Sequence, residues 1–143
     1  MRNSENKEEL FVLLAEGIRG LTTPAHIYST AGTGVVCNTR DVDLSYLAPC
    51  NHEEADTRVF VHLADAVRLG HTEALISSGD TDVVVLAVSA MAKLPALKEL
   101  WVDVGNGRKL RYIAVHEISA ALGKNKFEKI RYIEFFIQYH YSI

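Results

Sequence analysis

The chain has 143 residues, of which 48% are hydrophobic and 23% charged, as is typical of one folded domain and not of a disordered or fibrous protein. No apolar run approaches the roughly 18 residues that a membrane-spanning helix needs, and the polar first residues lack the pattern of a secretory signal. We therefore expect one intracellular domain, nuclear or cytoplasmic, without a membrane partner. The sequence predicts no oligomeric state.

The net charge of -3 is distributed unevenly. From Lys93 onward nine Lys and Arg oppose five Asp and Glu, a balance of +4, while six basic and thirteen acidic residues precede it, a balance of -7. An acidic part beside a basic part fits a metal site next to a bound polyanion. Ordinary solvent-exposed faces explain the same charge distribution more simply. A dedicated nucleic-acid binder is far more basic overall.

The two cysteines, Cys37 and Cys50, do not form a C-x-x-C pair, and no His/Cys set has zinc-ligand spacing. We interpret them as reduced thiols. The six scattered histidines are interpreted as surface or cap residues.

Residues 4–20 have the pattern of a helix, because Ser4 can cap its start, glutamates follow in the first turn and leucines recur at helical spacing. Residues 25–29 and 35–38 are short strand candidates around a turn-rich segment, which predicts a hairpin. Residues 40–43 contain an Asp-x-Asp that follows no convincing apolar strand, and we interpret them as a loop.

Residues 51–70 predict a second helix, with Asn51 as its N-cap and Gly70 as its stop. Five apolar residues share one face of this helix: Val59, Phe60, Leu63, Ala66 and Val67. Asp56 lies on that same face, and a carboxylate in line with a buried stripe needs a partner. Glu54 either caps the helix or binds a metal ion. If Glu54 is the capping residue, Glu53 is the substitute metal ligand.

Residues 73–78 predict a buried strand that delivers Asp80 and Asp82 to its C-terminal edge, and a helix follows over residues 83–93. Two ionised carboxylates about 4 Å apart repel by roughly 4 kcal/mol at an effective dielectric near 20. The pair should therefore bind a cation, for which a hard divalent ion is the natural choice, or turn into water. Asp and Thr also make ordinary turns and caps, so the motif alone favours a turn and a site equally.

Strands over residues 99–104 and 109–113 flank Asn106-Gly107, a strong hairpin signal, and a helix follows over residues 115–122. The aromatic-rich residues 127–143 contain no cap or breaker. Because strand and helix elements alternate, we expect an α/β fold: a three-layer α/β/α domain with a mainly parallel central sheet and a β-hairpin near residues 99–113.

In such a sheet, the start of the helix over residues 51–70 and the end of the strand over residues 73–78 share one rim. Four acids should converge there: Glu54, Asp56, Asp80 and Asp82. Acids around a cleft with basic residues nearby are typical of metal-dependent phosphodiester hydrolysis, in which two ions roughly 3.5 to 4 Å apart activate water and stabilise the leaving oxygen.

Two acidic motifs, Glu54-Ala55-Asp56 before an apolar helix and Ser78-Gly79-Asp80-Thr81-Asp82 after a strand, resemble the internal region of flap endonucleases and their PIN-like relatives. Residues 47–58, 80–86 and 111–118 are more closely similar to transposon-associated PIN-like proteins of marine invertebrates. The resemblance implies a PIN-like nuclease acting on DNA or RNA. It also implies water as the nucleophile and Mg²⁺ or Mn²⁺ bound by Glu54, Asp56, Asp80 and Asp82.

The nuclease family also uses an aspartate on its first strand and another beyond the segment that corresponds to Gly123. Neither has a counterpart here. We therefore expect residues 1–143 to be a single, truncated PIN-like domain with an incomplete site.

Three alternatives stay open. The motif also fits a haloacid-dehalogenase-type phosphatase with Asp80 as nucleophile and Asp82 as acid/base, although no convincing second acidic pair follows. A Toprim-type site, one glutamate with an Asp-x-Asp, does not account for the acids at the start of the second helix. A degenerate PIN-like module that binds nucleic acid or protein without catalysis agrees with the missing acids and the modest charge.

Overall fold

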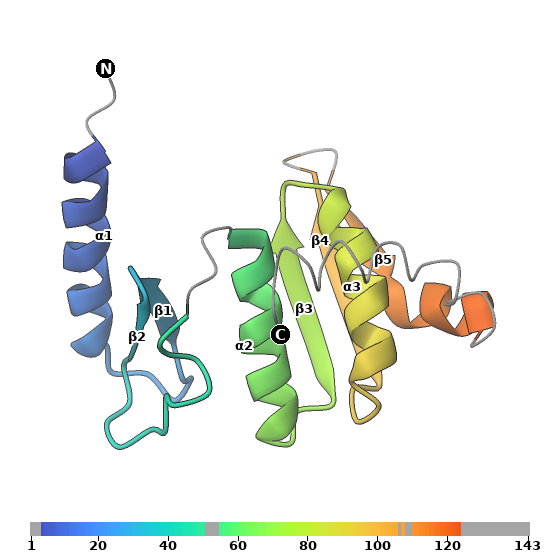
Figure 1. Ribbon diagram of the computed structural model, residues 1–143, viewed down its shortest axis with the longest axis horizontal. Coiled ribbons are helices and arrows are strands. Elements are labelled where there is room, and N and C mark those ends of the chain that lie inside the picture. Colours follow the sequence, from blue (N-terminus) through green and yellow to red (C-terminus); the bar gives the residue numbers. More distant parts are fainter. Residues whose placement is uncertain (1–3, 51–54, 106, 108–109, 124–143) are drawn as a thin grey trace. The chain divides into compact units, whose positions relative to one another are not determined.

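A computed structural model of the chain describes residues 4–50, 55–105, 107 and 110–123, except for the side chains of residues 4–8, 55 and 56. The chain divides into two compact units, residues 1–53 and residues 54–143 (Figure 1). The single truncated domain expected from the sequence stays a prediction. Within the described ranges, none of the helices has the length and apolar character needed to cross a membrane.

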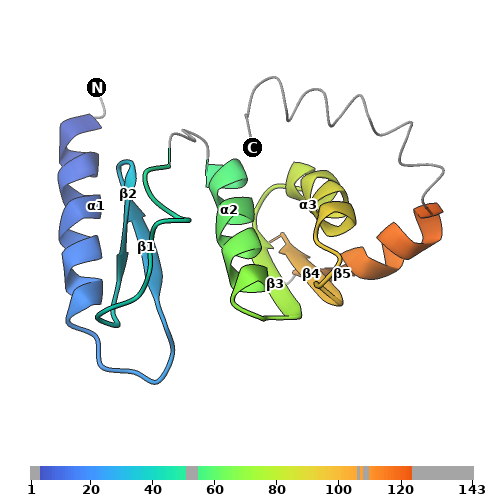
Figure 2. The same cartoon turned by 60° about the horizontal axis from the view of Figure 1, so that its bottom comes forward.

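The first unit consists of a helix packed on a β-hairpin (Figure 2). Helix α1 (Ser4–Arg19) contacts both β1 (Tyr28–Ala31) and β2 (Gly34–Cys37). The two strands pair antiparallel, with Tyr28 opposite Cys37. The helix and the hairpin predicted from the sequence are confirmed.

The turn of this hairpin is tighter than predicted. Ala31 and Gly34 are paired, so only Gly32 and Thr33 lie between the strands. Gly32 has a φ of 61°, which suits the first central position of a type II′ turn, where glycine is preferred.

The open end of the hairpin is tied by the side chain of Asn38. Its Oδ1 accepts a hydrogen bond from the Ile27 amide at 2.7 Å, and its Nδ2 donates to the Ala25 carbonyl at 3.1 Å. Residues 25–27, predicted to be part of the strand, are thus held to Asn38 by its side chain and by one backbone bond, from the Asn38 amide to the Ile27 carbonyl at 3.2 Å.

Most apolar side chains of α1 are exposed. Leu10, Leu13 and Leu14 are 53%, 65% and 55% exposed, whereas Ala15 is buried. The periodicity that correctly predicted the helix therefore does not mark a buried face in this unit.

The second unit consists of helices and a three-stranded sheet. Its elements are α2 (Ala55–Arg68), β3 (Glu73–Ser78), α3 (Asp82–Lys93), β4 (Glu99–Val104) and β5 (Arg111–Ala114), and residues 115–123 are also helical. The strand order is β3-β4-β5. Both α2 and α3 pack on one face of this sheet (Figure 2).

The sheet is mixed, which confirms an α/β fold in its general form. β3 and β4 are parallel and are joined through α3, whereas β4 and β5 form the predicted antiparallel hairpin, with Trp101 opposite Ala114. The mainly parallel sheet expected from the alternation of elements is not found in the described residues. The reason is the connection after β4: Gly105 and Gly107 have φ values of 92° and 55°, and the chain turns back directly without a helical crossover.

The core of the second unit lies between the sheet and its helices. Alternate β4 residues Leu100, Val102 and Val104 are buried, and they pack in one cluster with Leu63 of α2 and Ala87 of α3. Because every second residue of β4 is fixed in this core, the carboxyl ends of β3 and β4 are held at a defined edge.

Candidate functional site

Asp80 and Asp82 lie at the C-terminal edge of the parallel strand pair. Ser78, the last residue of β3, pairs with Val104, the last residue of β4, so both strands end at the same edge. α3 begins at Asp82, and both aspartates are exposed. The strand and the helix predicted around these aspartates are therefore present, but the strand is not buried as predicted: only Ile76 of β3 is buried, because the other face of the strand is exposed at Leu75. Ligands of open α/β sheets collect at such an edge.

Local hydrogen bonds shape the segment between β3 and α3. The Ser78 Oγ accepts a hydrogen bond from the Asp80 amide at 3.1 Å, and the Asp80 Oδ1 accepts one from the Asp82 amide at 2.9 Å. Thr81 occupies the N-cap position but makes no side-chain cap bond. The Asp80 carboxylate thus satisfies a first-turn amide of α3, which is the ordinary turn chemistry of aspartate.

This structural role leaves carboxylate oxygens for a ligand. No other described residue makes a hydrogen bond to Asp80 Oδ2 or to either oxygen of Asp82. Mg²⁺ is typically bound through one or two carboxylates while waters and phosphate oxygens complete its shell. Two exposed carboxylates separated by one residue fit that requirement.

The described side chains include no group of three or more His, Cys, Asp or Glu that could hold a metal ion. Glu53 and Glu54 lie outside the described residues, and Asp56 is placed only as a backbone position in the first turn of α2. The structure therefore places Asp80 and Asp82 at the same edge of the sheet, and the convergence of all four predicted acids stays a prediction.

The arrangement of α2 agrees with that prediction at the level of the backbone. Figure 1 shows α2 antiparallel to β3, so the first turn of α2 and the C-terminal end of β3 lie at the same end of the unit. The predicted apolar face of α2 is confirmed by Leu63 in the core, with Val59 and Val67 packed against it. Position 56 lies two turns before Leu63 along this face.

Sequence reasoning missed two charged residues near this edge. Arg111, exposed at the start of β5, pairs with Val104 and so ends the row Ser78–Val104–Arg111 along the edge. Asp103, half-buried on β4, pairs with Ser77 and Tyr112 one residue further in. The predicted Asn106-Gly107 hairpin was the signal that could have brought Arg111 back to this edge.

Neither a family model nor a curated protein nor a solved structure matches this chain.

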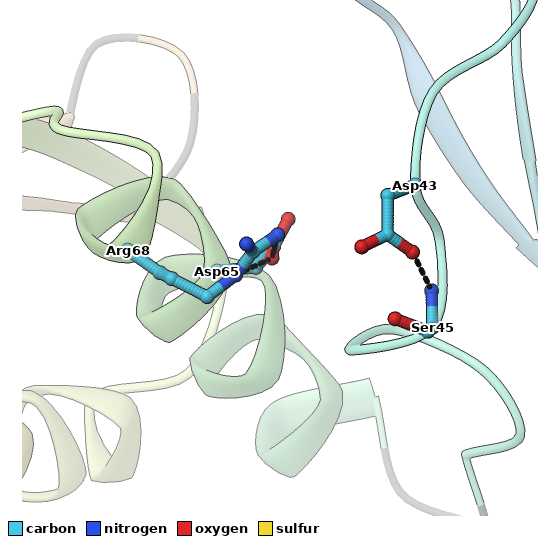
Figure 3. Close-up of polar contacts among 4 residues, drawn as sticks. All are labelled: Asp43, Ser45, Asp65 and Arg68. Carbon is cyan, nitrogen blue, oxygen red and sulfur yellow. Dashed lines mark hydrogen bonds and ion pairs between the residues drawn. The ribbon is translucent and has the colours of Figure 1, made fainter.

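A second charged pair, within α2, has a structural role (Figure 3). Asp65 is buried, and its Oδ1 accepts hydrogen bonds from Arg68 Nη2 at 2.7 Å and Nε at 3.0 Å. Such a pair satisfies a carboxylate that would otherwise be costly to bury. Nearby, burial lowers the pKa of His62 below its ordinary value of 6.5; the Asp65 charge opposes this and Arg58 adds to it.

Proposed function

We propose that the chain is a PIN-like, metal-dependent nuclease domain that hydrolyses phosphodiesters of DNA or RNA. Its acids are Glu54, Asp56, Asp80 and Asp82, and its ion is Mg²⁺ or Mn²⁺. The observation that supports this most is the exposure of Asp80 and Asp82 at the carboxyl edge of the parallel β3–β4 pair.

A three-layer α/β/α architecture is part of the same proposal. α2 and α3 supply one helical layer on the β3–β4–β5 sheet. The second layer and the wider strand set are proposed from the resemblance of the acidic motifs to PIN-like proteins.

Each group at the edge has a distinct role in this proposal. The free oxygens of Asp80 and Asp82 hold the ion, which when bound supplies charge stabilisation and an activated water. The Arg111 guanidinium binds the nucleic-acid backbone, because its planar fork matches phosphate oxygens. The positive end of α3 favours the same phosphate.

The proposal is tested by incubating the full chain with single-stranded DNA, single-stranded RNA and a DNA flap, with Mn²⁺ or with a chelator. We expect cleavage that requires Mn²⁺ and falls about 100-fold or more in Asp80→Asn, since even an outer-shell partner of a metal ligand contributes about 10- to 100-fold. Asparagine keeps the oxygen that accepts the Asp82 amide, so α3 retains this bond. Asp43→Asn, in the other Asp-x-Asp, is the matched control and should cleave normally.

The alternatives give different results. Hydrolysis of a simple phosphomonoester without cleavage of nucleic acid would contradict the nuclease and support a phosphatase that uses Asp80. Binding of oligonucleotides without any Mn²⁺-dependent cleavage would contradict it in favour of a non-catalytic module. Equal cleavage by the unmodified chain and by Asp80→Asn would show that Asp80 does not take part in the reaction.

A further inference from the structure

Helix α1 has two faces that differ in what they contact. It lies along one side of the β1–β2 hairpin (Figure 2), and Ala15, the one buried residue among its described side chains, marks the face that meets the strands. Successive residues of a helix are rotated by about 100°, so four residues lie away from Ala15 and from the hairpin. They are Leu10, Leu14, Gly17 and Leu21. We call these four residues the leucine row.

The leucine row is exposed along its whole length. Leu10 is 53%, Leu14 is 55% and Leu21 is 49% exposed. The Leu21 amide donates to the Ile18 carbonyl at 3.0 Å, so the turn continues past the last helical residue and keeps Leu21 in the row. Large apolar side chains that gather on one exposed face are typical of an interaction surface.

The first unit has little buried apolar surface of its own. Among its described residues the buried apolar side chains are Ala15, Val35, Leu47 and Cys50. A two-stranded hairpin is marginally stable alone, and a helix owes most of its stability to the packing of one face. A partner on the leucine row would therefore stabilise a unit that is otherwise poorly packed.

The spacing of the leucine row favours another helix as that partner. Its members follow one another at intervals of four, three and four residues, which is the pattern with which two helices pack side by side. The charged residues with described side chains on α1, Glu9, Glu16 and Arg19, all lie outside the row. The surface to be covered is therefore a narrow apolar seam without charges.

The leucine row is complementary in size to itself when two copies run antiparallel. A Cβ added at Gly17 would meet no atom within 4 Å, so the row has an open gap at this position. Antiparallel pairing places Leu14 of each copy against Gly17 of the other, and Leu10 against Leu21. Such a contact uses the same patch on both copies, as a two-fold dimer requires, and it sets the two helix dipoles in opposite directions.

We propose that the leucine row binds the leucine row of a second copy of this chain, with the two α1 helices antiparallel. The contact is formed by the first unit alone. It does not depend on metal binding or nuclease activity.

Sedimentation velocity of the full chain over a range of concentrations tests the proposal. The mass should rise from one chain toward two, and Leu14→Lys should weaken the dimer about 30-fold or more, as for a central residue of an interface. Leucine and lysine have similar helix propensities, so α1 itself is preserved. Leu75→Lys, at a leucine of the second unit that is 58% exposed, is the matched control and should dimerise normally. A monomer at every concentration, or a dimer that Leu14→Lys leaves intact, would overturn the proposal.

A second pair of variants tests the antiparallel orientation. Leu10→Glu should weaken the dimer, and Leu10→Glu/Leu21→Lys should recover part of the lost affinity, because antiparallel pairing sets the two opposite charges against each other. In a parallel pair like charges would meet and the double variant would associate more weakly than the single one. The recovery cannot come from a general effect on folding, since the second substitution removes another leucine. Absence of any recovery would overturn the antiparallel contact.

Discussion

The chain contains the Asp-x-Asp motif twice, at residues 41–43 and at residues 80–82, and the two copies have different surroundings. Locally they are alike: Asp43 Oδ1 accepts the amide of the residue two positions later at 3.0 Å (Figure 3), and Asp80 Oδ1 does the same at 2.9 Å. Neither the spacing nor this hydrogen bond distinguishes a turn from a site.

The surroundings do distinguish them. The first motif lies in turns after the four-residue strand β2, where Asp41 adopts a φ of 62°. The second follows the six-residue strand β3, which is paired along its length with β4, and it opens the twelve-residue helix α3. A sheet edge and a helix start together favour the second motif over the first as the place where a ligand would bind.

The largest effect is expected in the core that supports the second motif. Leu100 is fully buried on β4, so Leu100→Ala should lower the free energy of unfolding by about 2–5 kcal/mol through lost contacts and a cavity. Leu13 on α1 is 65% exposed, so Leu13→Ala should change the free energy of unfolding by no more than about 0.5 kcal/mol. Urea unfolding of both variants measures the difference; equal losses would show that the leucines of α1 are buried in the protein in solution.

The second unit could largely be predicted from sequence because its signals are local and agree with one another. The periodic face of α2, the apolar run of β3 and the stop before Pro95 each correspond to an observed element. The hairpin predicted at Asn106-Gly107 is also confirmed, and its direct return makes the β4–β5 pair antiparallel in a sheet that was expected to be mainly parallel.

Other features depend on packing between elements, which local patterns do not report. The leucines of α1 have helical spacing whether or not another surface covers them, so their exposure was not predictable. The position of Arg111 beside the carboxyl ends of β3 and β4 follows from strand register, which the sequence did not define. A shared site of Asp56, Asp80 and Asp82, which stays a prediction, likewise requires a side-chain arrangement that periodicity alone cannot specify.

An intermediate effect, on DNA binding, is expected from the basic residue at the sheet edge that carries the second motif. Arg111→Ala should weaken binding of single-stranded DNA and lower the slope of log affinity against log salt by about 1, because one phosphate contact is lost. Arg40→Ala, next to the first motif, is the matched control and should leave the slope unchanged. Fluorescence anisotropy with a labelled oligonucleotide at several salt concentrations makes the comparison. The same loss in both variants would mean that binding does not centre on the second motif.

The smallest effect is expected on the pH dependence of stability, through His62 of α2, the helix that also carries Asp56. Burial lowers the pKa of His62, so protonation favours the unfolded chain and stability falls as the pH drops below about 6.5, down to the lowered pKa. His62→Gln should remove this part of the pH dependence. Near pH 8, where His62 of the unmodified chain is neutral, the two proteins should have similar free energies of unfolding. Chemical unfolding across this pH range tests it, and an unchanged dependence in the variant would contradict the burial of a neutral ring.

The most direct test of the contrast between the two motifs is Mn²⁺ binding to the full chain, measured by electron paramagnetic resonance without any substrate. Three proteins are compared: the unmodified chain, Asp80→Asn/Asp82→Asn, and the matched Asp41→Asn/Asp43→Asn, in which asparagine tolerates the left-handed backbone at residue 41. We predict saturable binding by the unmodified chain and by the 41/43 variant, and its loss in the 80/82 variant. Equal binding by all three proteins, or loss confined to the 41/43 variant, would contradict a metal site at the edge of β3 and β4.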